Sequence, residues 1–150
     1  MSHDGSDEAD WILDSETGIG GLYGGRVWES GVPRGLTLPK DDSGVLPYIT
    51  IHFGVPVAMP RAQAIAGGVR SAPHLFGFAV HVHASTVDDL KAATKAVVGK
   101  LEGAEPSTTG NAGEITLNGG HTFDTQDNSG EQTRYMRMIH FAVVIGFAGE

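Results

Sequence analysis

Seven histidines are the residues of this sequence best suited to chemistry. His81 and His83 are two positions apart in a segment that alternates like a β-strand, so both imidazoles are expected on one face of that strand. His52 or His140 could lie beside them on a neighbouring strand. Neutral imidazoles supply nitrogen ligands that several transition metals accept. The spacing therefore permits a metal site.

Cupins build a metal site of this kind from three histidines on the wall of a β-barrel. Their sequences carry a glycine six residues before the first histidine of the pair and a glutamate a few residues after the second. In this sequence the position six residues before His81 is Leu75 rather than glycine. The nearest acidic residues after His83, Asp88 and Asp89, belong to the start of a helix. We therefore favour histidines that are solvated or lie in an interface. A small cupin-like metal-binding protein or enzyme that uses His81 and His83 stays as the alternative.

The sequence lacks the flanking segments or motif residues that other catalytic and nucleotide-binding sites require. The glycines between Gly18 and Gly25 have neither the preceding apolar strand nor the following helix that a phosphate-binding loop needs. A Ser–His–Asp triad requires no fixed order along the chain, but no serine lies in a Gly-x-Ser-x-Gly elbow. Cysteine is absent, which removes thiolate chemistry. We expect no enzyme activity, no catalytic residue, no metal and no cofactor.

Length and charge narrow the class of protein. A chain of 150 residues is the size of one domain, so residues 1–150 are predicted to form a single domain. The formal charge of −8 disfavours a nucleic-acid groove, which needs clustered Lys and Arg. No apolar run approaches the roughly 20 residues that span a bilayer, so no membrane contact is expected. Residues 1–9 are polar and acidic, unlike a signal peptide, and are predicted to be a mobile tail.

The elements that would position these residues indicate an α+β fold. Strands are predicted at 26–28, 47–53, 75–83 and 134–147, with a glycine-turn hairpin at 114–123 and an exposed loop over 124–133. One main helix is predicted at about 86–102, where Thr86 and Asp89 form a variant of the capping box. Its apolar stripe covers one face of a mostly antiparallel sheet and comprises Val87, Leu90, Thr94, Val97, Val98 and Leu101. A short, weak helix is predicted at 9–15.

A long apolar connection and the start of the last strand are the predicted contact surfaces. Residues 54–74 contain three prolines and a Gly-Gly pair, yet they carry several large aliphatic side chains, which is typical of a functional loop or projecting hairpin. Arg134 and Arg137 begin the last strand, either as snorkelling residues of a sheet edge or as partners in an ion pair between subunits. The predicted interface residues are Val57, Met59, Arg61, Ile65, Arg70, Arg134 and Arg137.

The order and spacing of several segments carry a family resemblance. These segments are Gly25–Trp28 leading to Val32-Pro33, Pro47–Ile51, Val97–Gly103, Arg134–Arg137 and His140–Val144. Together, over residues 10 to 147, they resemble the tail terminator, or tail completion, family of long-tailed bacteriophages. The glycine-broken first helix and the long 54–74 segment depart from that family's pattern, so ring contacts made by its first helix are not transferred to this chain.

The resemblance implies a structural role in a virion. Proteins of the family have an α+β fold and form a hexameric ring that stops growth of the tail tube and docks the tail to head-completion proteins. The implied partners are other copies of this chain, the major tail tube protein and a head-completion or connector protein, with DNA only passing through the lumen. The implied location is the tail neck of the virion, assembled in the host cytoplasm. A neighbouring head–tail connector protein is a further alternative.

Overall fold

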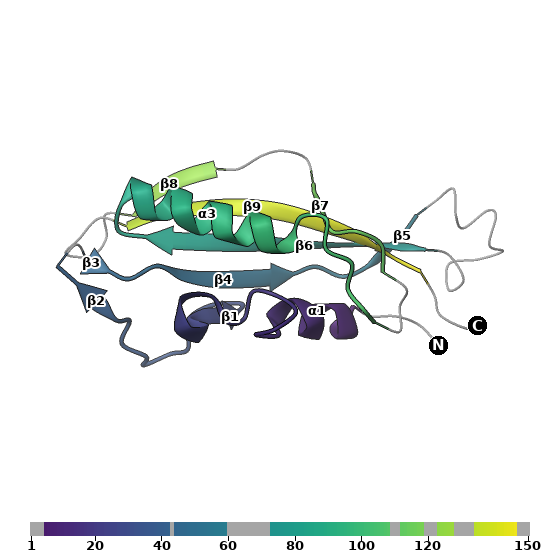
Figure 1. The fold of residues 1–150 in the computed structure, drawn as a ribbon, viewed down its shortest axis with the longest axis horizontal. Helices are drawn as coiled ribbons and strands as arrows, with labels where there is room; N and C mark the ends of the chain where they lie inside the picture. Colours follow the sequence, from purple (N-terminus) through teal and green to yellow (C-terminus); the bar gives the residue numbers. More distant parts are fainter. Residues whose placement is uncertain are drawn as a thin grey trace.

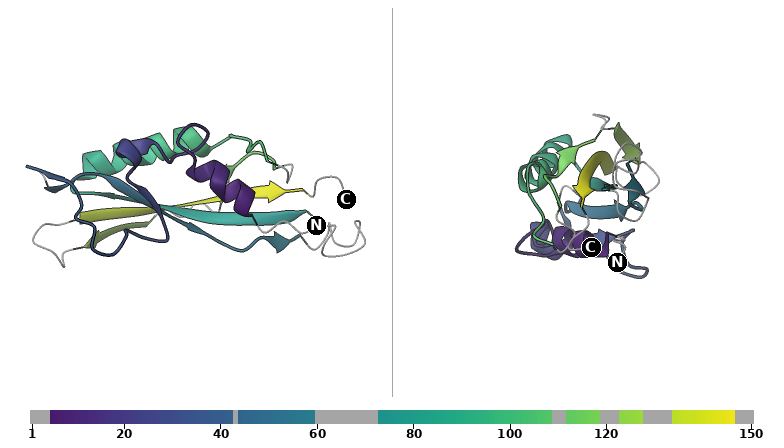
Figure 2. Two further views of the ribbon diagram at one scale, coloured as in Figure 1. Left: turned by 90° about the horizontal axis from the view of Figure 1, so that it is seen from below. Right: turned by 90° about the vertical axis from the view of Figure 1, so that its right-hand side faces the viewer.

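The structure is a computed structural model that describes residues 5–42, 44–59, 73–108, 112–118, 123–127 and 134–146. Its centre is a seven-stranded, mostly antiparallel sheet, and the two described α-helices lie on the same face of it (Figures 1 and 2). This arrangement confirms the predicted α+β fold class, with one main helix packed on one face of the sheet.

The sheet is built around two long strands. Its strand order is β1-β4-β6-β9-β7, with β5 paired to β6 and β8 paired to β9, while β2 and β3 form a separate pair. Only the β1–β4 pairing within this sheet is parallel among the described strands. The elements are α1 (Ser6–Leu13), the 3-10 turn η1 (Leu22–Gly25), β1 (Val27–Glu29), β2 (Lys40–Asp41), β3 (Gly44–Val45), β4 (Tyr48–Phe53), β5 (Val57–Ala58), β6 (His74–Ala84), α3 (Val87–Leu101), β7 (Thr116–Leu117), β8 (Phe123–Asp127) and β9 (Arg134–Ile145).

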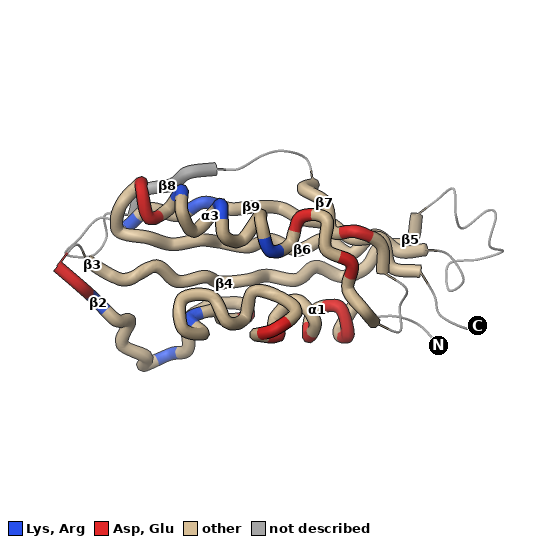
Figure 3. Tube along the Cα trace, in the orientation of Figure 1, with Lys and Arg blue, Asp and Glu red and all other residues tan. Residues whose placement is uncertain are grey.

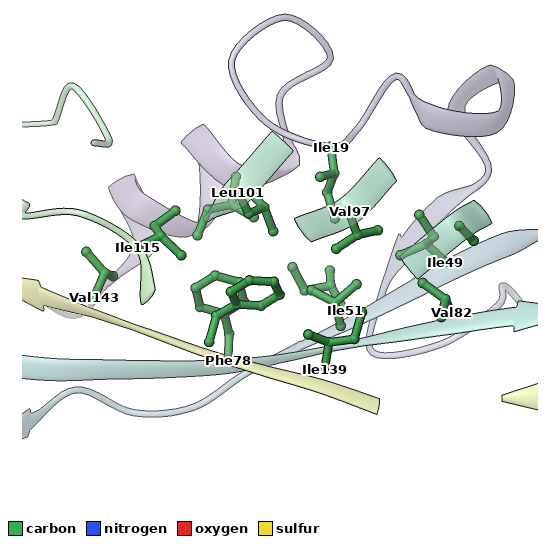
Figure 4. Packing of buried hydrophobic residues seen from close by; sticks show 14 of the residues in the cluster. Ile19, Ile49, Ile51, Phe78, Val82, Val97, Leu101, Ile115, Ile139 and Val143 are labelled. Carbon is green, nitrogen blue, oxygen red and sulfur yellow. The ribbon is translucent and has the colours of Figure 1, made fainter. Parts of the chain in front are cut away.

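The helix-facing side of β4, β6 and β9 forms the core. Alternation sends one set of side chains from each strand toward the helices, as predicted for 47–53, 75–83 and 134–147. The ring centroids of Phe78 and Phe141, which are directly paired in register, lie 5.4 Å apart in a stacked arrangement. Figure 4 shows how aliphatic side chains from the helices and loops close over this layer.

Helix α3 packs onto the sheet through a stripe close to the predicted one. Thr86 is its N-cap, and the Thr86 hydroxyl accepts a hydrogen bond from the backbone N–H of Asp89 at 3.1 Å. Leu90, Ala93, Val97 and Leu101 are buried. Burying the three larger aliphatic side chains contributes roughly 5 to 9 kcal/mol before conformational entropy is counted.

Two positions of the predicted stripe behave differently from the rest. Val87 is 43% exposed, because it is the first helical residue and lies beyond the turn that contacts the sheet. Thr94 is half-buried, and its hydroxyl donates to the carbonyl of Leu90 at 2.8 Å. This hydrogen bond satisfies the hydroxyl, so a threonine can lie half-buried at this position.

Helix α1 begins earlier than the sequence indicated. It spans Ser6–Leu13 rather than 9–15, so residues 6–9, predicted as part of a mobile tail, form its first turn. The early start lets Ile12 reach the core, where it is fully buried. The helix stops because Asp14 Oδ1 accepts backbone hydrogen bonds from Glu16 at 2.8 Å and Thr17 at 3.2 Å, which makes a tight turn. The same two bonds lower the pKa of the Asp14 carboxyl.

The predicted hairpin at 114–123 is wrong. β7 and β8 do not pair with each other; both pair with β9, Thr116 opposite Ala142 and Phe123 opposite Met138. The first residues of the predicted loop over 124–133 also belong to β8. An edge strand is held by backbone hydrogen bonds to its neighbour, so a polar sequence without alternation can still pair there.

Candidate interface on the open face of the sheet

The sheet face opposite the helices is the candidate functional surface. We call it the open face, because no described helix lies on it (Figure 2). Strict alternation along each strand fixes its members. On β1, β4, β5, β6 and β9 they are Trp28, Tyr48, Thr50, His52, Val57, Leu75, Gly77, Ala79, His81, His83, Arg134, Met136, Met138, His140, Ala142 and Val144.

The four candidate histidines meet on this face. In register, Ala79 lies between His52 on β4 and His140 on β9, and His81 follows two residues along β6. The ring centroids of His52 and His81 are 4.3 Å apart with an interplanar angle of 37°. The centroid of His83 lies 6.5 Å from that of His81. The expected sharing of one face by His81 and His83 is therefore confirmed, and both His52 and His140 are brought beside them.

An aromatic stack covers one end of the open face. The rings of Tyr48 and His83 lie parallel, 4.4 Å apart, and Trp28 packs against Tyr48 at 6.0 Å. Thr50 Oγ1 lies 3.2 Å from His83 Nε2, within hydrogen-bond distance. These contacts explain why Tyr48 and Thr50 are only 6% and 5% exposed on a face without helices.

The pKa values of two histidines on the open face, His83 and His81, are lowered. Burial, together with smaller repulsive effects from His81, Arg134 and His52, lowers the pKa of His83 to about 4. Burial also lowers the pKa of His81, with smaller effects from His52 and His140. His83 is therefore uncharged at neutral pH, and the environment of His81 favours its neutral form.

The arrangement differs from the cupin-like alternative. The described strands form an open sheet, with β1 at one edge and β7 and β8 at the other, rather than a closed barrel. Within the described residues, no group of three or more His, Asp or Glu side chains is placed to hold a metal ion.

A shallow hollow of about 350 Å³ lies in the middle of the open face. It exists because Gly77 and Ala79 are small, so the sheet has no large side chains between His52 and His140. Asn118, just after β7, forms part of its rim. The hollow could receive a side chain from another molecule, and it presents imidazoles on opposite sides.

Exposed aliphatic side chains line up at the end of the open face that carries β5. Val57 lies opposite Leu75, and Leu75 lies opposite Val144, so the three form one row across β5, β6 and β9. Their exposed fractions are 65%, 39% and 39%. We call this set the aliphatic row. Leu75 and Val144 were missing from the predicted interface; the alternation of their strands, followed to the strand ends, would have placed them on this face.

The predicted interface residues of the long connection are only partly visible. Val57 and Met59 are exposed, and the backbone N–H of Met59 bonds the carbonyl of Pro73, next to the β5–β6 pairing. Arg61, Ile65 and Arg70 lie outside the described residues. Their interface role remains a prediction.

The two arginines at the start of β9 lie on different faces. Arg137 points to the helix side, where its guanidinium donates to Thr94 Oγ1 at 3.2 Å. Arg134 is on the open face, and its charge contributes to lowering the pKa of His83. The interpretation of this segment as a sheet edge is wrong, because β9 pairs with β6 on one side and with β8 on the other.

Charges are unevenly distributed over the molecule (Figure 3). Helix α1 contains Asp7, Glu8 and Asp10 and no basic residue, whereas α3 carries Lys91, Lys95 and Lys100 together with Asp88 and Asp89. No helix of the described chain is both long and apolar enough to cross a membrane.

Comparison with known proteins identifies a shared fold. No protein-family model and no curated protein matches the chain. Among solved structures, a chain described as belonging to the virion of a native gene transfer agent (GTA) particle is similar, with a TM-score of 0.55 and 20% sequence identity. The match covers 93% of this chain and 92% of that chain. This protein therefore has, over nearly its whole length, the fold of a chain from a virion.

Proposed function

We propose that this protein is a structural component of a phage-like virion and acts as a tail terminator, a ring of identical subunits that caps the tail tube. The observation that carries the proposal is the fold shared with a chain of a gene transfer agent virion over 93% of this sequence. The sequence resemblance to tail terminators points to the same class of particle. In this role the protein works by shape and interface free energy and performs no catalysis.

The aliphatic row supports self-association. A closed ring needs apolar surface that the isolated subunit does not bury. Val57, Leu75 and Val144 supply such a surface on three adjacent strands, and Val55, 82% exposed, lies close by in the sequence. The row is continuous with the hollow next to Gly77, so apolar contact and a receiving depression are neighbours on one face.

The proposed ring would be a hexamer with two protein partners. One rim would contact the major tail tube protein, and the other would contact a head-completion or connector protein at the tail neck. Six copies, each at −8, would carry a formal charge of about −48. An acidic lumen would repel DNA and let it pass without being held. Assembly in the host cytoplasm would precede incorporation into the virion.

Light scattering after size-exclusion chromatography, together with negative-stain imaging of the particle neck, tests the proposal. The expected result is a species of six copies, formed by the protein alone or on adding the tail tube protein, and a ring at the tube's head-proximal end. A strict monomer at high concentration, with no ring in assembled particles, would contradict it. A ring on the head side of the neck would instead identify a connector protein.

A further inference from the structure

The open face gathers four histidines with very few balancing charges. His52, His81, His83 and His140 come from β4, β6 and β9, and ring contacts join His52 to His81 and His81 to His83. The other charged residue of these strands on the face is Arg134, which is positive. β1 contributes Trp28 and no ionisable group.

Tyr48 adds a further ionisable group to this face, a phenol stacked on His83. On the edge strand β8 the backbone register pairs Asp127 with Arg134, and no residue of β8 is paired with a histidine.

We propose that this histidine patch makes the open face an acid-sensitive surface: a proton on His83 would place a positive charge against the stacked Tyr48 ring and beside the neighbouring imidazoles, and would loosen the packing between β4 and β6.

The close packing of these rings explains why protonation of His83 costs free energy in the folded protein. The parallel contact between Tyr48 and His83 and the neighbouring His52–His81 contact hold rings only 4.3 to 4.4 Å apart. A proton on His83 would place a partly desolvated positive charge beside two further imidazoles and Arg134. No carboxylate lies opposite His83 in the strand register to compensate, because its partners there are Tyr48 and Met136.

The direction of the pH effect follows from linkage. The folded chain resists a proton at His83, with a pKa of about 4, that the unfolded chain accepts at the ordinary value of 6.5. The stability that neutral His83 contributes is therefore complete above pH 6.5. It is lost progressively as the pH falls from about 6.5 toward 4.

Thermal unfolding of three full-length proteins between pH 7.5 and pH 4.5 tests the proposal. The proteins are the wild type, His83→Phe, which keeps a ring against Tyr48 but cannot be protonated, and His74→Gln, a control on the same strand but the opposite face. We expect the acid-induced fall in Tm to be at least about 3 °C smaller in His83→Phe than in the wild type. His74→Gln should fall as the wild type does. Equal falls in the wild type and His83→Phe would overturn the proposal.

Histidine titration of the wild type by NMR gives a second test that needs no variant. His83 is expected to remain neutral at pH 5.5, and its signals should shift together with those of neighbouring β4 residues at lower pH. A midpoint for His83 at or above 6.5 would overturn the proposal. Neither measurement depends on ring formation, so the acid-sensitive surface and the proposed function can fail separately.

Discussion

Gly18 lies so close to helix α1 that a Cβ atom at this position would be 1.9 Å from the carbonyl oxygen of Ile12. Next to it, the backbone N–H of Ile19 donates to that same carbonyl at 2.8 Å, and the Ile19 side chain is fully buried. The absence of a side chain at Gly18 is therefore what lets the connector fold back and place Ile19 in the core.

Gly18→Ala should consequently be strongly destabilising. The obstructing atom is backbone, which cannot move aside without displacing the end of α1. We expect a loss of about 3 kcal/mol or more in the free energy of unfolding, measured by urea denaturation. A loss below about 1 kcal/mol would show that the connector can repack.

Gly99→Ala is the matched glycine-to-alanine control, and it is expected to raise the free energy of unfolding rather than lower it. Gly99 lies on the exposed side of α3, and, apart from its chain neighbours and the backbone of its own helix, no atom of the described residues lies within 4 Å of where its Cβ would be. Alanine costs less backbone entropy in a helix interior, so we expect stabilisation of about 0.5 to 1 kcal/mol in the same denaturation assay. Destabilisation would indicate that another molecule packs against this side of α3.

Leu90→Asp should be among the most harmful substitutions in the chain. Leu90 is 1% exposed, and a carboxylate there would be buried among apolar side chains. We expect a loss of about 4 kcal/mol or more, seen as a large fall in the urea midpoint. Ala92→Asp, on the exposed side of the same helix, is the control and should change the midpoint little.

Thr86→Ala tests the cap of α3. The substitution removes the hydroxyl that accepts the Asp89 N–H, and the expected loss is about 1 kcal/mol. Thr86→Ser keeps an acceptor and should retain most of the stability. If serine and alanine behave alike in thermal denaturation, the hydrogen bond does not stabilise the helix.

Val57→Asp tests the aliphatic row as a self-association surface. The side chain is 65% exposed, so the subunit should fold normally, while a charge in the row should oppose its burial against another copy. We expect the ring population to fall at least about tenfold at a fixed protein concentration, measured by light scattering; this corresponds to about 1.4 kcal/mol in the free energy of forming the whole ring. Leu36→Asp, at a 46% exposed residue outside the sheet, is the control and should assemble as the wild type does.

The candidate surface could be predicted only in part. The sequence placed His81 and His83 on one face and Val57 and Met59 in an exposed segment. It did not find the aliphatic row, because Leu75 and Val144 become neighbours only through the β6–β9 register. It also gave no sign that His83 stacks on Tyr48, since that contact joins residues from two strands.

The sequence by itself determined the main helix, predicted at about 86–102 and observed at Val87–Leu101, the three main strands and the faces of those strands. Each follows from a repeat of 2 or 3.6 residues and from a local cap, which are properties of neighbouring residues. Only the tertiary structure decided that β8 pairs with β9, that Ile19 and Ile115 enter the core, and that α1 starts at Ser6. These features depend on backbone pairing and close approach between distant segments, which leave no periodic pattern in the sequence.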